Sequence, residues 1–205
     1  MFDFKKEFRA QYQPKITPEI IEVPEMIVIA VDGSGDPNTS DSYKEAIEIL
    51  YGLSYAIKMG NKDILEYIVA PLEGFWIVDE EKENNSNILN KNRYIWTSFI
   101  RQPDFVENDV FIRAQTAVLK KKPHLNISRA RLEIISEGLC VQAMHLGSWD
   151  DESKTVDAMH KYATSNGYII DMSDNRRHHE IYLSDPRKSV PEKMKTVIRH
   201  PVRLI

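Results

Sequence analysis

The stretch His178-His179-Glu180-Ile181-Tyr182-Leu183-Ser184-Asp185-Pro186 has the β-branched and aromatic character of a strand that ends at an Asp-Pro turn. Because alternate residues of a strand share a face, His178, Glu180 and Tyr182 are predicted to point to one side. His179, Ile181 and Leu183 point to the other side, which is predicted to face the core. A carboxylate beside a phenol can bind a cation or act as a general base. An ordinary ion pair on a half-exposed sheet is the simpler alternative.

Composition limits the class of protein. The 205 residues suit one domain or two small halves, and 42% hydrophobic residues are enough for a real interior. A net charge of −4 gives no reason to expect nucleic acid or an anionic membrane as a partner. The N-terminus lacks the layout of a signal peptide, and no apolar run is long enough to span a bilayer, so a cytoplasmic protein is expected. The single cysteine, Cys140, excludes internal disulfides and cysteine-only metal sites.

Three helices are predicted from apolar residues at helical spacing. The first begins at a capping box formed by Ser42 and Glu45 and ends near residues 59–61. The second covers about residues 110–122. The third is capped by Asp150 or Asp151, with Val156, Met159 and Ala163 on its inner face.

Strands are predicted wherever short apolar or β-branched runs are bounded by turn residues. These runs are residues 26–31, 67–69, 75–78, 94–100, 132–135, 139–145, 168–170, 179–183 and 196–198. Residues 1–22 are predicted to be an N-terminal arm, residues 71–74 a turn, and residues 79–92 an exposed loop. Pro191 is expected to open a short helical turn, and Pro201 to end the last strand.

The order strand, helix, strand, strand, strand occurs twice, at about residues 23–103 and 137–203. Ile100-Arg101-Gln102-Pro103 closes the first half, and Ile198-Arg199-His200-Pro201 closes the second. Residues 28–30 are matched with residues 141–143. The predicted fold is α+β, with duplicated units, an antiparallel sheet, helices on one side and a central cleft on a pseudo-twofold axis. In this register Trp76 falls opposite Tyr182, so both are expected to face the cleft.

Several stretches together resemble the stand-alone GyrI-like small-molecule-binding family. They are Pro71-Leu72-Glu73-Gly74-Phe75-Trp76, Phe99-Ile100-Arg101-Gln102-Pro103, Glu137-Gly138-Leu139-Cys140-Val141-Gln142, His145-Leu146-Gly147-Ser148-Trp149-Asp150, and residues 178–187 and 191–199. The resemblance covers about residues 23–203 and implies a GyrI-like domain over residues 23–205. The family is similar to the effector domains of multidrug-sensing transcription activators and to bacterial gyrase inhibitors. It has a duplicated α+β fold with a cleft for flat, apolar, often cationic aromatic compounds.

The resemblance also implies site residues and a detoxifying activity. Some stand-alone members add water to cyclopropane-bearing cytotoxins. The family's acidic residue falls on Glu180, which would be the base, with Tyr182 as the second catalytic residue. The implied ligand-binding residues are Trp76, Trp149, His145, Glu180 and Tyr182. Trp149 stands where relatives commonly have tyrosine, so the aromatic wall is kept and a hydroxyl is lost. For His145, a structural hydrogen bond and proton transfer are both open.

No metal and no cofactor are predicted. The rings of His178 and His179 diverge on a strand, and Leu183 stands where a zinc-protease motif needs its second histidine. Trp96 is equally compatible with core and with a cleft wall. The expected partner is a small hydrophobic aromatic ligand bound by a monomer.

The alternative function is a non-catalytic, drug-sequestering or regulatory module that acts through a protein partner such as gyrase. A transcription activator is disfavoured, because residues 1–22 are too short for a helix-turn-helix.

Overall fold

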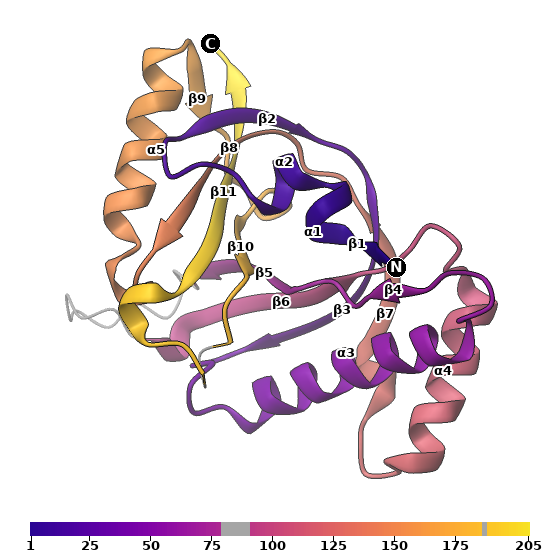
Figure 1. Ribbon diagram of the computed structural model, residues 1–205. Coiled ribbons are helices and arrows are strands. Elements are labelled where there is room, and N and C mark those ends of the chain that lie inside the picture. The colour runs from indigo at the N-terminus through magenta and orange to yellow at the C-terminus, as the bar shows by residue number, and fades with distance from the viewer. Residues whose placement is uncertain (79–90, 186–187) are drawn as a thin grey trace. The chain divides into compact units, whose positions relative to one another are not determined.

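The computed structural model describes residues 1–78, 91–185 and 188–205 (Figure 1). The chain divides into two compact units. Unit 1 comprises residues 1–2, 26–69 and 74–134, and unit 2 comprises residues 3–25, 70–73 and 135–205. The predicted α+β class with antiparallel pairing is confirmed. Within the described residues, none of the helices is both long and apolar enough to cross a membrane.

The described residues of unit 1 form two α-helices and a sheet of order β5-β6-β3-β7. Its elements are β3 (Met26–Ser34), α3 (Asp41–Gly60), β4 (Tyr67–Ile68), β5 (Leu72–Val78), η2 (Lys91–Arg93), β6 (Tyr94–Arg101), α4 (Asn108–Lys121), η3 (Ile127–Arg129) and β7 (Ala130–Ile135). The short β1 (Phe2–Asp3) pairs with β4. Helix α3 packs on β3 and β6 and lies beside α4 (Figure 1).

Unit 2 contains one long helix and a sheet of order β2-β8-β11-β10, in which β9 also pairs with β11. Its elements are α1 (Phe4–Glu7), α2 (Arg9–Tyr12), β2 (Glu19–Val23), β8 (Gly138–Leu146), η4 (Trp149–Asp151), α5 (Ser153–Ser165), β9 (Tyr168–Ile170), β10 (His178–Tyr182), η5 (Pro191–Lys193) and β11 (Lys195–Leu204). The predicted arm, residues 1–22, thus supplies two short helices and most of strand β2. Helix α5 runs along β8 and β9 (Figure 1).

The element order predicted for the repeat is present in both units. Unit 1 has β3-α3-β4-β5-β6 and unit 2 has β8-α5-β9-β10-β11. Strands β3, β6 and β5 are ordered in their sheet like β8, β11 and β10, whereas β4 pairs with β1 and its counterpart β9 pairs with β11. One detail of the predicted match is wrong. Arg101 pairs with Val28, whereas its counterpart Arg199 pairs with Gln142, so Val28 corresponds to Gln142 and not to Val141. A slip of one residue exchanges the two faces of a strand.

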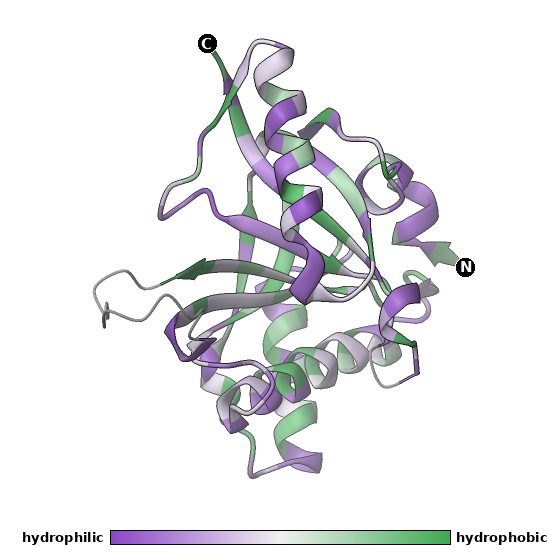
Figure 2. Cartoon of the chain, turned by 90° about the vertical axis from the view of Figure 1, so that its left-hand side faces the viewer, coloured by the Kyte–Doolittle hydropathy of each residue, from purple (hydrophilic) through white to green (hydrophobic). Residues whose placement is uncertain are grey.

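The helices bury the residues that their spacing predicts. In α3 the buried residues include Ala46, Ile49, Leu50, Leu53 and Ile57. Figure 2 shows hydrophilic and hydrophobic residues alternating along the helices. The core of unit 2 joins Met159 and Ala163 of α5 to residues of β8 and β11, namely Val141, Ala143, Ile198 and Val202.

The predicted helix caps are displaced. Ser40, two residues before the predicted cap, is the N-cap of α3. Its hydroxyl accepts a hydrogen bond from the backbone N–H of Tyr43. Ser148 instead caps a short 3₁₀ turn, and α5 begins only at Ser153, after Glu152. The sequence signals located both helices to within a few residues, which is the usual precision for helix ends.

Three predicted strand ends are also wrong. Strand β3 continues through Asp32 and Gly33 to Ser34, and β5 already begins at Leu72, where a turn was expected. Strand β11 continues through Pro201, which lies where β11 changes partner from β8 to β9. The missing N–H of proline is therefore tolerated at a point where one ladder ends. Most of the predicted loop 79–92, residues 79–90, lies outside the described residues.

Candidate functional site

Strand β10 presents Glu180 and Tyr182 on one face of the unit 2 sheet, as predicted. Tyr182 pairs with Thr196 of β11, and Thr196 pairs with His145 of β8. Glu180 pairs with Ile198, which belongs to the apolar core beneath α5. The face that carries Glu180 is thus the face that α5 partly covers.

The aromatic residues predicted for unit 2 gather around Thr196. The ring centroids of Trp149 and Tyr182 lie 5.7 Å apart in an edge-to-face arrangement. The indole N–H of Trp149 donates to the Thr196 hydroxyl at 3.0 Å. This hydrogen bond fixes the orientation of Trp149, and the side chains of Trp149 and Tyr182 are both partly exposed.

His145 lies close by but is engaged on both sides of its ring. Its Nδ1 is 2.9 Å from the Thr155 hydroxyl, and its Nε2 is 2.9 Å from the Ser148 carbonyl oxygen. Only 4% of the residue is exposed. The ring thereby connects the end of β8 to the turn that carries Trp149, which is a positioning role.

Glu180 is nearly buried and is paired with a histidine. Its exposed fraction is 9%, and its Oε1 is 3.1 Å from Nε2 of His178. Burial disfavours the charged form of His178. The hydrogen bond to Glu180 and the charges of Glu180 and Glu152 outweigh burial and raise the pKa of His178.

A row of histidines continues from His178 toward α5. Nδ1 of His178 lies 2.6 Å from Nε2 of His200, and Nδ1 of His200 lies 2.7 Å from Nε2 of His160. Burial, followed by the positive charges of His178 and His160, lowers the pKa of His200 to about 2. This row was not predicted from the sequence, although His160 follows Val156 and Met159 at the i, i+3, i+4 spacing that marks an inward face.

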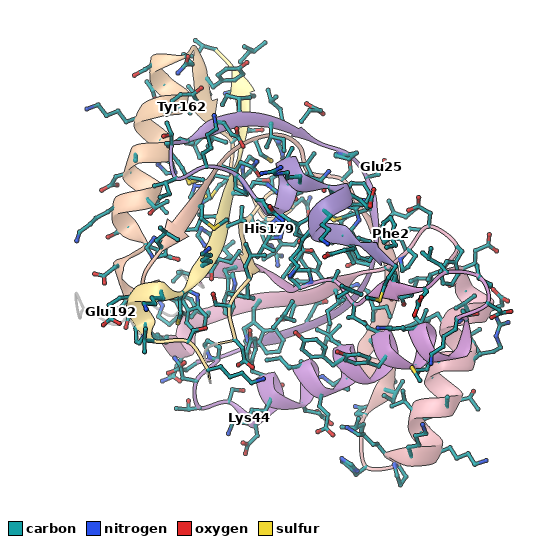
Figure 3. All side chains as sticks on the ribbon, viewed as in Figure 1. Phe2, Glu25, Lys44, Tyr162, His179 and Glu192 are labelled. Atoms are coloured by element: carbon teal, nitrogen blue, oxygen red, sulfur yellow. The ribbon has the colours of Figure 1, made fainter. Side chains whose placement is uncertain are left out.

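The opposite face of β10 holds a second polar cluster, which the sequence analysis assigned to core. His179 pairs with Arg199, and Arg199 pairs with Gln142, so these side chains form one row across the sheet. Figure 3 shows His179 in the interior of the side-chain packing. Its Nε2 is 3.1 Å from Glu73, and its Nδ1 is 3.0 Å from Glu137.

This buried cluster, formed by Tyr12, Glu73, Glu137, Gln142, His179 and Arg199, is closed by further hydrogen bonds. The Arg199 guanidinium donates to Glu137 at 2.8 Å, to Gln142 at 3.0 Å and to a carbonyl of α2. The Tyr12 hydroxyl donates to Glu73 at 2.8 Å. The sequence signal for it was Arg199, which directly follows the apolar pair Val197-Ile198 in β11.

The charges of the buried cluster stabilise one another. Burial alone would raise the pKa of the Glu137 carboxyl, but His179 and Arg199 hold it at about 2. Burial alone would lower the pKa of His179, but the charge and hydrogen bond of Glu137 and the hydrogen bond of Glu73 raise it. With side chains between 0% and 7% exposed, His179, Glu73, Glu137 and Arg199 have a scaffold role behind β10.

In unit 1, Trp76 and Trp96 have different environments. Trp96 is fully buried and meets Tyr43 edge-to-face at 4.9 Å, which assigns it to the core. Trp76 is partly exposed, with its ring centroid 6.0 Å from Tyr43 and 5.6 Å from Tyr94. It is therefore a partly exposed member of an aromatic cluster.

One group in the described part of the chain has the composition of a metal site. Glu152, His178 and Glu180 offer ligand atoms that lie within 4.8 Å of one another. Two of these atoms, on His178 and Glu180, are already at hydrogen-bonding distance. As expected for adjacent strand residues, the rings of His178 and His179 have separate partners.

Comparisons with known proteins agree with this architecture. The sequence matches the GyrI-like small molecule binding domain over residues 16–203. A crystal structure described as a hydrolase from Listeria innocua is 42% identical, with a TM-score of 0.90, and the match covers 99% of this chain and 100% of that one. An uncharacterized conserved protein from Listeria innocua is 44% identical, with a TM-score of 0.91 and the same coverage.

A more distant structure shares the fold alone. The C-terminal domain of EcmrR is 17% identical, with a TM-score of 0.53, and the match covers 92% of this chain and 98% of that domain. No curated protein matches the sequence. Because the family match spans most of the chain, this protein belongs to the GyrI-like small-molecule-binding domain family.

Proposed function

We propose that this domain binds flat, apolar, often cationic aromatic compounds and hydrolyses those that carry a cyclopropane ring. Glu180 is the proposed base, Tyr182 is the second catalytic residue, and Trp76 and Trp149 contribute to ligand binding. His145 contributes to ligand binding by holding the turn that carries Trp149. The observation that carries the proposal is a nearly buried carboxylate on the same strand face as Tyr182, which forms a partly exposed aromatic pair with Trp149. The hydrolase description of a structure that is 42% identical supports the reaction class.

The site chemistry fits such ligands. Flat aromatic compounds stack on indole and phenol faces, and a cation gains further from those faces and from a carboxylate. Trp149 is fixed by its hydrogen bond to Thr196, so little side-chain freedom is lost when a ligand binds. Neutral ligands would depend on stacking, and cationic ligands on stacking together with Glu180.

The proposed reaction adds one water molecule to the strained ring. Glu180 removes a proton from water while the water oxygen forms a bond to one ring carbon. The bond from that carbon to its ring neighbour breaks, and its electron pair moves to the activated side of the substrate. A proton from solvent adds to that side and Glu180 releases the proton that it removed, so the product is the substrate plus one water.

The deciding experiment compares Glu180→Gln with Glu192→Gln. Glutamine keeps the shape of the side chain and removes its charge, and Glu192 is an exposed carboxylate in the same unit. The probes are one neutral and one cationic cyclopropane-bearing alkylator, followed by mass spectrometry. We expect a product heavier by one water from the unaltered protein, and about 10²–10⁴-fold slower turnover in Glu180→Gln only.

The outcomes separate enzyme from binder. Weaker binding of the cationic probe alone, without turnover by any variant, would mean that Glu180 holds a cation and that the domain sequesters its ligands. Unchanged binding and turnover in Glu180→Gln would remove Glu180 from the site. Binding of neither probe, together with capture of gyrase by the purified protein, would favour the regulatory alternative.

A further inference from the structure

The histidine row is a continuous hydrogen-bonded path from Glu180 to α5. Its three contacts measure 3.1 Å from Glu180 to His178, 2.6 Å from His178 to His200, and 2.7 Å from His200 to His160. Each contact between two rings needs a proton on one nitrogen and a lone pair on the other. Consecutive contacts use opposite nitrogens of each ring, so all donors can point in the same direction along the row.

The two ends of the row have different environments. Glu180 is nearly buried, whereas His160 is only partly buried, on a helix with exposed neighbours such as Asp157 and Lys161. His200, in the middle, is 2% exposed. Around it the interface between α5 and β11 is apolar, with Met159 and Ile198 fully buried. A polar path through an apolar layer is costly unless its hydrogen bonds are complete.

We propose that His178, His200 and His160 form a proton relay that connects Glu180 with the solvent-facing side of α5. The inference deepens the proposed function, since it assigns a route to the proton that Glu180 removes from water. The three histidines are positioning and proton-carrying residues, because only Glu180 is assigned to the reacting atoms.

The transfer conserves every bond. A proton on Oε1 of Glu180 moves to Nε2 of His178, while the Nδ1 proton of His178 moves to Nε2 of His200. The Nδ1 proton of His200 then moves to Nε2 of His160. Three bonds to hydrogen break and three form, and His160 releases a proton to water from its other nitrogen. The same path run backward returns a proton to Glu180.

Of the three histidines, His178 has the surroundings that best favour a bound proton. His178 is faced by Glu180 on its own strand, by Glu152 before α5 and by His200 on β11. His160 is near Asp157 on its own helix, but burial lowers its pKa more than Asp157 raises it. Because the pKa of His200 is lowered to about 2, a proton passes through His200 without residing there. This is the distribution expected of a path between a buried group and solvent.

The test measures proton movement directly and does not depend on turnover. Histidines are labelled with ¹⁵N, and NMR records the exchange of the ring protons of His178 and His200 with water. The variant is His160→Gln, because an amide keeps a hydrogen bond but does not carry a proton near neutral pH. The matched control is His124→Gln, which alters an exposed histidine of unit 1.

The relay predicts nitrogen–nitrogen couplings across both ring contacts, and exchange at His178 and His200 that slows at least tenfold in His160→Gln only. Added imidazole should restore the exchange rate. Absent couplings, or equal exchange rates in both variants with unchanged spectra elsewhere, would overturn the relay. If exchange slows but the unaltered protein converts no cyclopropane compound, the relay stands and the proposed hydrolysis fails.

Discussion

The two faces of β10 use charged residues in different ways. On one face, Glu180 keeps 9% of its surface exposed and its partner His178 leads onward to other rings. On the other face, the buried cluster around His179 is sealed, and its carboxylates and cations satisfy one another. A sealed cluster holds a strand in place, whereas an accessible carboxylate can meet a ligand.

At the residue scale, we predict that Glu137→Gln destabilises the protein by about 3–5 kcal/mol. The change leaves the buried cations His179 and Arg199 with one carboxylate, Glu73, in place of two. Uncompensated buried charge is costly. The measurement is the free energy of unfolding from urea titration followed by circular dichroism.

The matched control for that prediction is Glu133→Gln. Glu133 pairs with Arg131 at 2.9 Å, but both side chains are about a third exposed or more, so the loss should stay below about 1 kcal/mol. Equal losses in the two variants would show that burial does not amplify the Glu137 interactions.

At the scale of single elements, β3 and α3 differ in how they use glycine. Gly33 pairs with Trp96 across the β3–β6 ladder, and a Cβ at Gly33 would lie 2.2 Å from the Trp96 ring. Gly52, in the middle of α3, would place a Cβ at 3.6 Å from Val118, which is ordinary van der Waals contact. Gly33 therefore makes room for the Trp96 indole, whereas Gly52 leaves space for a methyl group.

These environments predict opposite effects of the same change. Gly33→Ala should destabilise unit 1 by about 1–3 kcal/mol, because the buried indole must move. Gly52→Ala should stabilise it by about 0.5–1 kcal/mol through higher helix propensity. Thermal unfolding of both variants is the measurement. A Gly33→Ala variant as stable as the unaltered protein would mean that Trp96 does not occupy this space.

Local patterns in the sequence were sufficient for the elements themselves. The inner face of α3 follows from helical spacing, and β10 follows from its β-branched and aromatic residues, because both signals lie within a few neighbouring positions. The end of β3 was missed because Gly33 normally marks a turn, and only its ladder partner Trp96 explains a glycine there.

The polar clusters could not be predicted from local patterns. The hydrogen bond between Gln142 and Glu19 joins residues 123 positions apart, and that between Arg199 and Gln142 joins residues 57 positions apart. Strand order and register decide such contacts, and a shift of one residue would move each side chain to the other face. The sequence thus located Glu180 and Tyr182 on one face but not the partners of His179.

At the scale of the whole molecule, stability depends on a few buried titrating groups. The folded pKa of His200 is about 2, against 6.5 for an ordinary histidine, because of burial and the charges of His178 and His160. The folded pKa of Glu137 is about 2, against 4.5. The pKa values of His178 and His179 are raised above 6.5. Each difference from the unfolded chain makes the free energy of unfolding depend on pH.

These values predict maximum stability near pH 6.5 or slightly above. Below pH 6.5 the unfolded chain binds a proton at His200 that the folded chain does not, so stability should fall by about 1.4 kcal/mol per pH unit. Below pH 4.5 the protonation of Glu137 in the unfolded chain adds to this loss. As pH rises through the folded pKa values of His178 and His179, the stability that they contribute below pH 6.5 is lost. Urea titrations between pH 4.5 and pH 9 measure the loss of stability on the acid side and on the alkaline side.

His200→Gln should flatten the slope of stability against pH between pH 6.5 and pH 4.5, although it lowers stability at neutral pH. His124→Gln should leave that slope unchanged. A slope that persists in His200→Gln would assign the acid sensitivity to another group.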